Sequence, residues 1–438
     1  MSESKKPGNA APNPTRRHFL SRAALAVAVT PVLPAALAEN THQHAHKNAH
    51  TTVHAPAKDN ELEPFYGKHQ SGITTAMQRH TYFMAFDLTT LRRADVIALL
   101  QAWTDAAAIL TQGPAALDVA LDKMPQDSGA MIGLSSARLT ITFGFGPGLF
   151  QKDGIDRYGL ASQRPAALAN LPRFTGDQLI SERSGGDLSV QACADDPQVA
   201  EYAIRRIASL LQGRAKIRWA QTGFNGNNKA GDTLRNPMGF KDGTVNMAAQ
   251  NPDVTKLLLW AGAEGPAWMQ DGSYMVIRTI RVAIEHWDQM TLGFQEATVG
   301  RHKHSGAPIG KQHEFEAHDF DANDAEGNPI VAENAHVRMA AAITNDGAQI
   351  FRRSFSYDNG VANIAERWPP WHQVMTFDAG QLFLCYQRDP RSGFSKIFEN
   401  MAKFDMLNQF TTHVGSGLFA CPPAARKGEY IGQQLFLA

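Results

Sequence analysis

Residues 236–246 read Asn236-Pro237-Met238-Gly239-Phe240-Lys241-Asp242-Gly243-Thr244-Val245-Asn246, the most distinctive stretch of this 438-residue chain. Glycine adopts backbone conformations that other residues avoid, and here a glycine stands on each side of Lys241-Asp242. The pattern predicts a tight turn, or a backbone pressed against something large and flat. Because Asp-Gly is a common turn pair, two interpretations stay open: a structural turn, and an aspartate that faces a pocket.

Two later stretches also contain candidate functional side chains. Glu333-Asn334-Ala335-His336-Val337-Arg338-Met339 follows a long polar segment, and its lone His336 is either a ligand or an ordinary hydrogen-bonded histidine. Ile350-Phe351-Arg352-Arg353-Ser354-Phe355-Ser356-Tyr357 is expected to form a strand, in which Arg352 and Arg353 would point to opposite faces. An arginine on a buried face needs an anionic partner, of which a carboxylate is the simplest.

The elements predicted around these stretches alternate between strands and helices. Apolar spacings of three and four residues predict helices, and β-branched alternation predicts strands. The predicted strands span residues 80–88, 139–145, 187–194, 217–221, 274–282, 349–356, 382–386 and 418–420, and the predicted helices span 91–112, 197–213, a segment after Val282, and 394–404. Residues 300–334 form a long polar loop, of a length that is usually functional or disordered. The pattern favours an α+β fold of two units, each an antiparallel sheet covered by helices.

Composition limits the classes of function. Lys+Arg and Asp+Glu both number 42, so the formal net charge is zero, and we expect neither nucleic acid nor an anionic membrane as a bulk partner. The three cysteines, Cys193, Cys385 and Cys421, form no CxxC pair and predict neither a disulfide framework nor a zinc site. We expect each to be a small buried side chain.

The N-terminus has the features of an export signal. Arg16-Arg17 precede a weakly apolar run that ends at Ala36-Leu37-Ala38, a typical cleavage site. Paired arginines in this position indicate a twin-arginine signal over residues 1–38, with an ordinary secretory leader as the alternative. The run is shorter than the roughly 20 apolar residues of a membrane span, and we expect no integral membrane segment in the mature chain.

Residues 39–60 are polar and rich in histidine, with His42, His44, His46, His50 and His54. Such a composition predicts a flexible tail. The tail is either a solubilising linker or a segment that binds copper, zinc or nickel ions loosely. The folded units expected after it span residues 61–225 and 226–438.

Together these stretches resemble the dye-decolourising peroxidase family. Gly239-Phe240-Lys241-Asp242-Gly243 matches its GxxDG element, and Ala335-His336-Val337-Arg338 and Phe351–Tyr357 match its proximal-histidine and distal-arginine segments in the family's order. Residues 65–73 and Leu188–Pro197 also agree with the family pattern. The resemblance extends from about Pro64 to the C-terminus and is closest to the exported, EfeB-type deferrochelatase/peroxidase branch.

The resemblance implies a fold and a cofactor. Members of the family have two ferredoxin-like units in a dimeric α+β barrel-like arrangement, with one haem b in the C-terminal unit. His336 would be the proximal ligand of the haem iron, and a hydrogen bond on its other ring nitrogen would strengthen it as a donor. Asp389 is a candidate for that second partner. Gly243, Thr244 and Val245 would line the haem through their backbone.

The resemblance also implies the chemistry of the distal side. Asp242 would be the general base that takes a proton from hydrogen peroxide and returns it to the leaving oxygen. With a reference pKa of about 3.9, an aspartate is ionised across acidic pH, so the enzyme should favour acid. Arg352 would stabilise the charge that develops as the O–O bond breaks, and it would also contact the haem.

The chain departs from the exported branch at one point. Relatives in that branch often have Asn-Pro-Arg soon after the proximal histidine, where this chain has Ala341-Ala342-Ile343. An arginine that could hold a haem propionate is therefore missing. We still expect these three residues to border the haem, but another residue must take over the role of the arginine, or the haem is held differently.

We therefore predict a periplasmic haem peroxidase that uses hydrogen peroxide to oxidise dyes, phenols or other bulky reductants. The resemblance also implies a link to iron supply, including release of iron from haem and contact with components of a ferrous-iron uptake system. By analogy with the family, we expect a homo-oligomer. Two alternatives stay open: a haem or iron carrier with incidental peroxidase activity, and a copper-binding protein that works through the tail.

Overall fold

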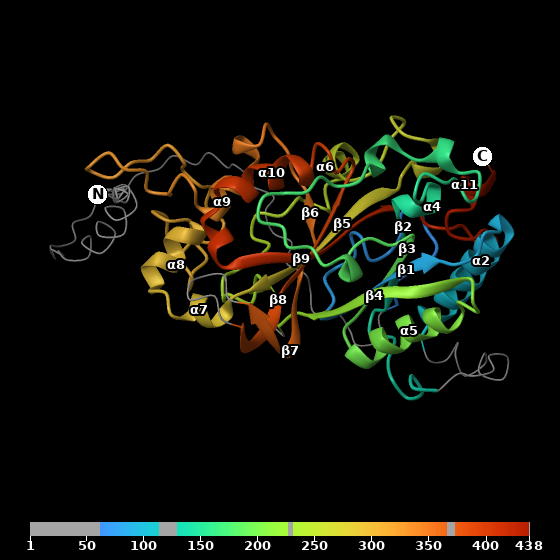
Figure 1. Ribbon diagram of the computed structural model, residues 1–438. Coiled ribbons are helices and arrows are strands. Elements are labelled where there is room, and N and C mark those ends of the chain that lie inside the picture. Colours follow the sequence, from blue (N-terminus) through green and yellow to red (C-terminus); the bar gives the residue numbers. More distant parts are fainter. Residues whose placement is uncertain (1–61, 114–128, 227–230, 366–372, 438) are drawn as a thin grey trace, which may run out of the picture. The chain divides into compact units, whose positions relative to one another are not determined.

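The computed structural model describes residues 62–113, 129–226, 231–365 and 373–437 (Figure 1). The predicted signal over residues 1–38 and the histidine-rich tail over residues 39–60 lie outside the described residues. Within the described ranges, no helix combines the length and the apolar character needed to cross a membrane.

The first half forms a four-stranded antiparallel sheet with two helices. Its main elements follow in the order β1 (His80–Leu88), α2 (Arg93–Leu110), β2 (Thr140–Phe145), β3 (Leu188–Ala194), α5 (Pro197–Ser209) and β4 (Ala215–Phe224). The strands lie side by side in the order β2-β3-β1-β4. A βαββαβ succession with the first and third strands in the centre is the ferredoxin-like arrangement that the sequence predicts.

The two helices of the first half are fixed by a cap and by a buried aromatic side chain. The Asp196 carboxylate accepts hydrogen bonds from the backbone amides of Gln198 and Val199, which is the pattern of a helix start. In α2, the fully buried Trp103 donates from its indole nitrogen to the carbonyl of Ile207 in α5, at 3.0 Å. Helix α5 packs on β1 and β3, and α2 packs on α5.

The second half repeats the same arrangement. Its main elements are β5 (Ser273–Val282), β6 (Phe351–Arg352), β7 (Phe355–Ala365), β8 (Gln373–Gln387), α10 (Phe394–Phe404) and β9 (Thr411–Cys421). The strands lie in the order β9-β5-β8-β7, and β6 also pairs with β8. This is again a ferredoxin-like order, with the first two strands of the half separated by a long connection.

Strands of the two halves join into one closed sheet. The pair Phe145 and Ala420 links β2 to β9, and the pair Phe224 and Ser356 links β4 to β7. Because β5 pairs with both β8 and β9, the strand pairings close into a ring. The predicted α+β, barrel-like fold is therefore confirmed, while the division near residue 225 stays a prediction.

Shorter helices fill the connections between these elements. They are α4 (Pro147–Phe150), η2 (Ala161–Gln163), η3 (Ala166–Leu168), η4 (Ser181–Arg183), α6 (Pro252–Leu258), η5 (Ala267–Met269), α7 (Ile284–Asp288), α8 (Leu292–Val299), α9 (His336–Ala340), η6 (Ala342–Thr344), η7 (Met406–Gln409) and α11 (Gln433–Leu437). Residues 300–334 contain neither a helix nor a strand of the sheet, as the sequence predicts for this segment.

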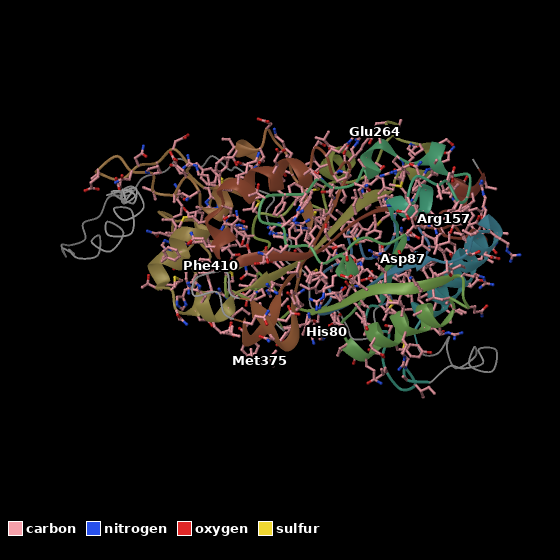
Figure 2. All side chains as sticks on the ribbon, in the orientation of Figure 1. His80, Asp87, Arg157, Glu264, Met375 and Phe410 are labelled. Atoms are coloured by element: carbon pink, nitrogen blue, oxygen red, sulfur yellow. The ribbon has the colours of Figure 1, made fainter. Side chains whose placement is uncertain are left out.

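A small apolar cluster supports the loop that carries Asp242. Met238 and Phe240, on the loop itself, pack with Trp287 of α7 and Phe410, which Figure 2 labels. The ring centroids of Phe240 and Trp287 are 6.1 Å apart, and those of Trp287 and Phe410 are 5.0 Å apart, both in edge-to-face contact. This cluster fixes the loop against the second half.

A buried ion-pair network stabilises the first half. Asp187 is almost fully buried and pairs with Lys152 at 3.1 Å and with Arg157 at 2.8 Å. Lys152 also pairs with Asp87 at 3.0 Å. Figure 2 labels Asp87 and Arg157. A buried carboxylate that is shared by two cations is costly to leave unpaired, so this network contributes to the stability of the fold.

Some predicted boundaries are wrong, for identifiable reasons. The predicted strand over residues 349–356 is divided into β6 and β7, although Arg352 and Phe355 keep one register against Cys385 and Leu382 of β8. Strand β8 is far longer than the predicted 382–386, because its first residues form a ribbon with β7 whose side chains, such as Met375 in Figure 2, are largely exposed. A ribbon of this kind lacks the alternation of buried and exposed residues that sequence patterns detect.

The three cysteines are free and buried, as the sequence predicts. Cys385 lies opposite Arg352 in the sheet, on β8. Burial raises the pKa of the Cys385 and Cys421 thiols well above the ordinary value. They are therefore neutral packing residues.

Candidate functional site

The stretch around Asp242 is a tight turn. The Asn236 amide donates to the Phe240 carbonyl at 2.9 Å, and the Asn236 side-chain oxygen accepts from the Met238 and Phe240 amides at 3.1 Å. Gly239 has φ +82°, and a Cβ there would lie 2.8 Å from a side-chain carbon of Lys303. The left-handed backbone conformation therefore favours glycine at this position.

The turn brings Asp242 to Arg352 of β6. The Arg352 guanidinium donates to Asp242 Oδ1 at 2.5 Å, and the Gln381 amide of β8 donates to Oδ2 at 2.8 Å. Asn246 holds the backbone of Arg352 from both sides, since its Oδ1 accepts from the Arg352 amide at 2.9 Å and its Nδ2 donates to the Arg352 carbonyl at 2.8 Å. The carboxylate partner expected for a strand arginine is therefore Asp242.

The surroundings keep Asp242 ionised. Burial alone would raise the pKa of this carboxyl, but the Arg352 charge, the hydrogen bonds from Gln381 and Arg352, and the charge of His336 together lower it below its ordinary value. Charge and hydrogen bonding thus outweigh desolvation. Asp242 is an anion even in acidic solution.

His336 stands at the start of α9 and is held by a carboxylate. Its Nδ1 lies 2.6 Å from Asp405 Oδ2, and the Asp405 side chain is only 3% exposed. The other oxygen of Asp405 accepts from the Leu407 amide at 2.8 Å. Burial alone would lower the pKa of His336, but the Asp405 carboxylate outweighs it and raises this pKa. Within the described part of the chain, Nε2 of His336 has no hydrogen-bond partner.

The sequence-based candidate for this carboxylate, Asp389, is wrong. Asp389 pairs with Arg391, two residues further along the chain, at 2.6 Å. Asp405 follows α10 and is 69 residues away from His336. No local pattern links these two positions, so sequence reasoning had no signal with which to find the pair.

The two pairs, Asp242–Arg352 and His336–Asp405, belong to one site. Asp242 and Arg352 both affect the pKa of His336, the first raising it and the second lowering it, so the groups lie within electrostatic reach of each other. The side chains of His336, Arg352 and Asp242 are 33%, 27% and 21% exposed. An imidazole with a free nitrogen and a carboxylate behind it is the donor that haem iron takes from proteins. These residues therefore fit a haem.

Glu314 connects the long polar loop to the turn. Its carboxylate accepts from the hydroxyls of Thr233 and Thr244, the latter at 2.9 Å, and pairs with the ammonium of Lys241. Burial would raise the pKa of Glu314, but the hydrogen bonds from these three side chains lower it. The Glu314 side chain thus holds three residues around Asp242. Sequence reasoning missed Glu314, because the only sequence signal for it was the length of the 300–334 loop.

The other predicted haem contacts follow Asp242 or His336 closely in the chain. Gly243 has φ +111°, and Val245 is largely exposed. Ala341 follows α9, and Ala342 and Ile343 lie in η6, where Ile343 is 80% exposed. Together with Thr244, their assignment as haem contacts stays a prediction.

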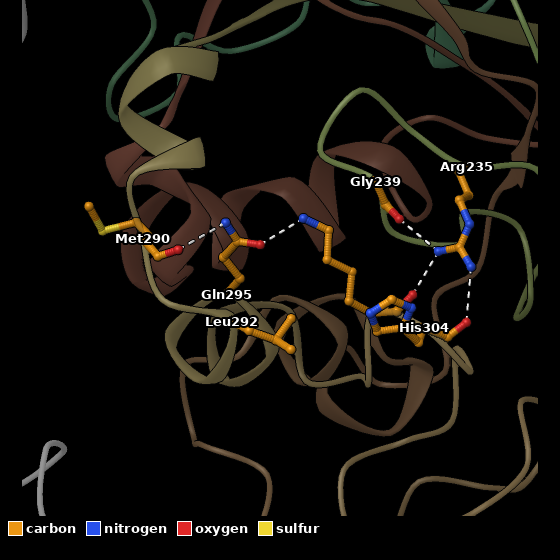
Figure 3. Close-up of a pocket in the computed structure, with 7 residues that line it drawn as sticks. Arg235, Gly239, Met290, Leu292, Gln295 and His304 are labelled. Carbon is orange, nitrogen blue, oxygen red and sulfur yellow. Dashed lines mark hydrogen bonds between the residues drawn. The ribbon is translucent and has the colours of Figure 1, made fainter.

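A pocket of about 560 Å³ opens beside Gly239 (Figure 3). The other side chains that line it are Arg235, Met290, Leu292, Gln295, Lys303 and His304. Arg235 donates to three carbonyls, those of Gly239 and Lys303 at 2.7 Å and that of His304 at 2.9 Å, and the Lys303 ammonium donates to Gln295 at 2.8 Å (Figure 3). The lining combines two cations with two apolar side chains and no acid, which suits an anion with an apolar part.

Comparison with known proteins agrees with this geometry. The family model described as Dyp-type peroxidase, N-terminal, matches residues 70–225, and the one described as Dyp-type peroxidase, C-terminal, matches residues 233–426. The deferrochelatase of Escherichia coli strain K12 is 34% identical over 441 residues, which cover 98% of this chain and 99% of the relative.

Solved structures show the same similarity. A DyP-type peroxidase from Streptomyces coelicolor is 39% identical with a TM-score of 0.78, and covers 87% of this chain and 98% of its own. Ferric DtpA from Streptomyces lividans is 38% identical with a TM-score of 0.78, again over 87% and 98% of the two chains. The chain is therefore a haem-dependent peroxidase with haem b as its cofactor, and it belongs to the DyP-type peroxidase family.

Proposed function

We propose that His336 is the proximal ligand of the haem iron and that Asp242 and Arg352 act on hydrogen peroxide. The reductants would be bulky organic molecules such as dyes and phenols. When bound, the haem supplies the redox chemistry that couples the reduction of peroxide to the oxidation of the reductant. The protein supplies a ligand, a base and a cation.

The observation that carries the proposal is the setting of Asp242. One of its oxygens is paired with Arg352 and the other with Gln381, so the carboxylate is fixed in place while its side chain remains partly exposed. A carboxylate oxygen has lone pairs to spare after one hydrogen bond. Asp242 would take a proton from hydrogen peroxide and return it to the leaving oxygen.

Arg352 would stabilise the negative charge that grows on the oxygen atoms as the O–O bond breaks. A guanidinium stays protonated at every working pH, and a fixed cation lowers the energy of such charge most when it needs no reorganisation. The clamp formed by Asn246 on the backbone of Arg352 supports this role. On the proximal side, Asp405 would orient the imidazole of His336 and strengthen it as a donor.

The substitution Asp242→Asn tests this proposal. It removes the base but leaves an acceptor for Arg352, so the purified protein should keep its haem and its Soret band. Turnover with hydrogen peroxide and a phenol should fall about 10²–10⁴-fold, the usual contribution of a positioned base. Asp358→Asn, on the exposed ribbon of β7, is the matched control because its carboxylate is exposed and accepts from the nearby Gly360 amide.

The alternative of a haem carrier with incidental activity makes the opposite prediction. For a carrier, Asp242→Asn would leave haem uptake and iron supply unchanged, and the loss of turnover would have no effect on growth with haem as the iron source. If Asp242→Asn retains wild-type turnover, the assignment of Asp242 as the base is wrong.

We also propose that the pocket beside Gly239 receives anionic aromatic reductants. Its cations, Arg235 and Lys303, would attract a sulfonate or carboxylate, while Met290 and Leu292 would contact the aromatic part. Lys303 also lies over the Phe240 ring, at 5.4 Å from its centre, which places the pocket directly against the turn that carries Asp242.

Export and iron supply complete the proposal. The twin arginines before the apolar run at the N-terminus support export of the folded protein to the periplasm. The name of the Escherichia coli relative, deferrochelatase, supports removal of iron from haem. Incubation of the holoprotein with a ferrous-iron chelator, followed by porphyrin fluorescence, tests this activity: intact metal-free porphyrin must appear together with the chelated iron.

A further inference from the structure

Two buried side chains of the 300–334 loop have polar atoms with no partner among the described residues. Both ring nitrogens of His318 are buried and unpaired. Arg301 is 5% exposed; one of its terminal nitrogens donates to the carbonyls of Gly306 and Glu314, at 2.5 and 3.0 Å, while the other is buried and unpaired. Buried polar groups in proteins are nearly always hydrogen-bonded, so these atoms point to a ligand.

Arg301 lies on the side of the site that holds Asp242. Burial and the charge of Arg352 lower the pKa of Arg301 to about 10 against the opposing charge of Glu314, so Arg301 is within electrostatic reach of Arg352, the partner of Asp242. Glu314, whose carbonyl Arg301 holds, bonds to Thr244 at 2.9 Å, two residues after Asp242. Arg301 is therefore next to the distal turn.

His318 connects Arg301 to the proximal helix. Its pKa is lowered by burial and by the Arg301 charge, which places the two side chains near each other. The His318 ring stacks on Phe320, with centroids 5.2 Å apart and planes 6° apart, and the Arg338 guanidinium lies 5.5 Å from the centre of the Phe320 ring. Arg338 follows His336 by two residues in α9. The row Arg301, His318, Phe320, Arg338 thus runs from the distal turn to the proximal histidine.

The chemistry of this row is that of a carboxylate site. It offers a guanidinium N–H and an imidazole nitrogen that are both desolvated, with a second guanidinium close by. Glu314, the acid whose charge acts on Arg301, already binds Lys241, Thr233 and Thr244. A ligand that spans the space between Asp242 and His336 and carries carboxylates on one edge would satisfy the unpaired atoms.

We propose that Arg301 and His318 bind a propionate carboxylate of the haem, an inference that rests on the proposed position of the haem between His336 and Asp242. The pair takes over the role of the arginine that exported relatives often carry where this chain has Ile343, a side chain that is 80% exposed and cannot donate a hydrogen bond. The propionate is thus held by the long polar loop and not by the segment after the proximal histidine.

The test uses the haem-loaded full chain in four variants. Arg301→Gln and His318→Phe remove the donors, and phenylalanine preserves the stacking on Phe320. His318→Gln restores a hydrogen-bonding group at the same place. His313→Phe is the matched control, because His313 is an exposed histidine of the same loop. Two readouts are measured: the propionate-bending band in the resonance Raman spectrum, and the rate of haem transfer to excess apomyoglobin.

We expect Arg301→Gln and His318→Phe to shift the propionate band and to release haem about 10- to 100-fold faster, as loss of one charge-assisted hydrogen bond predicts. His318→Gln should lie close to the wild type in both readouts, and His313→Phe should match it. A wild-type band and release rate in His318→Phe would overturn the proposal, and so would equal acceleration in His318→Phe and His313→Phe.

Two further outcomes are distinguishable. If Arg301→Gln does not fold, because it also loses two carbonyl bonds, the three histidine variants decide alone. A separate variant, His336→Ala, tests the proposed haem position. If its iron keeps the wild-type axial ligation, His336 is not the proximal ligand. The propionate band would still decide the present inference, because a shift in His318→Phe supports the contact and an unshifted band overturns it.

Discussion

Asp405→Asn is the most informative single substitution in this protein, because it changes the charge behind His336 and almost nothing else. The Asp405 carboxylate lies 2.6 Å from His336 Nδ1, and at 3% exposure water cannot replace it. Asparagine keeps an acceptor for the Leu407 amide. A carboxylate behind a ligating histidine makes the histidine a stronger donor, which favours ferric over ferrous iron.

The size of the effect follows from the same contact. Loss of such a partner typically changes metal binding 10- to 100-fold. If this loss falls mainly on the ferric state, the reduction potential should rise by roughly 60–120 mV, at 59 mV per tenfold change for one electron. Spectroelectrochemical titration of the ferric–ferrous couple measures this directly, and stopped-flow mixing with hydrogen peroxide shows whether the reaction slows as well.

Asp389→Asn is the matched control, since Asp389 pairs with Arg391 and not with His336. Its potential should equal that of the wild type. The reasoning is refuted if Asp405→Asn retains its haem and has the same potential as Asp389→Asn, because the Asp405 charge would then have no influence on the iron.

Three other measurements test the remaining structure. The charge of Arg352 is the main cause that lowers the pKa of Asp242. Asp242 is ionised above this lowered pKa, so activity is lost only as the pH falls through it. Arg352→Gln should raise the pKa of Asp242 and therefore move the acid limb of the kcat/KM profile to higher pH. Lys303→Gln should raise KM for a sulfonated dye several-fold but not for a neutral phenol, and equal changes would exclude the pocket as the dye site. Asp187→Asn should lower the free energy of unfolding by about 3–5 kcal/mol in denaturant titrations, whereas the exposed Asp153→Asn should not.

The sequence predicts best those elements that carry their own end signals. Asp196, followed by proline, predicts the start of α5, and the structure shows the capping bonds. Strand β9 was predicted only over residues 418–420, although it begins at Thr411, because Gly415 and Gly417 in its first half resemble a loop. Their pairing with β5 is a tertiary contact that no local pattern contains.

The candidate site divides in the same way. Asp242, Arg352 and His336 stand in distinctive local patterns, and the family resemblance ordered them. The hydrogen-bond partners of these residues have no such local pattern, because Gln381 lies 139 residues from Asp242 and Asp405 lies 69 residues from His336. Residue types are visible in a sequence, but a hydrogen bond between distant strands exists only once the sheet has closed.

The first half contains none of the proposed site residues, but the closed sheet lets it position one of them. Arg353 is buried and has no carboxylate in contact among the described residues; its guanidinium instead donates to the Thr75 carbonyl and to Gln78, at 2.9 Å, both in the first half. Neighbouring residues of an extended chain point to opposite faces. By holding Arg353 on one face, the first half turns Arg352 to the other, where Asn246 and Asp242 receive it. The distal pair is thus positioned from both halves at once, and the ring of strands is a condition for the chemistry as well as for the fold.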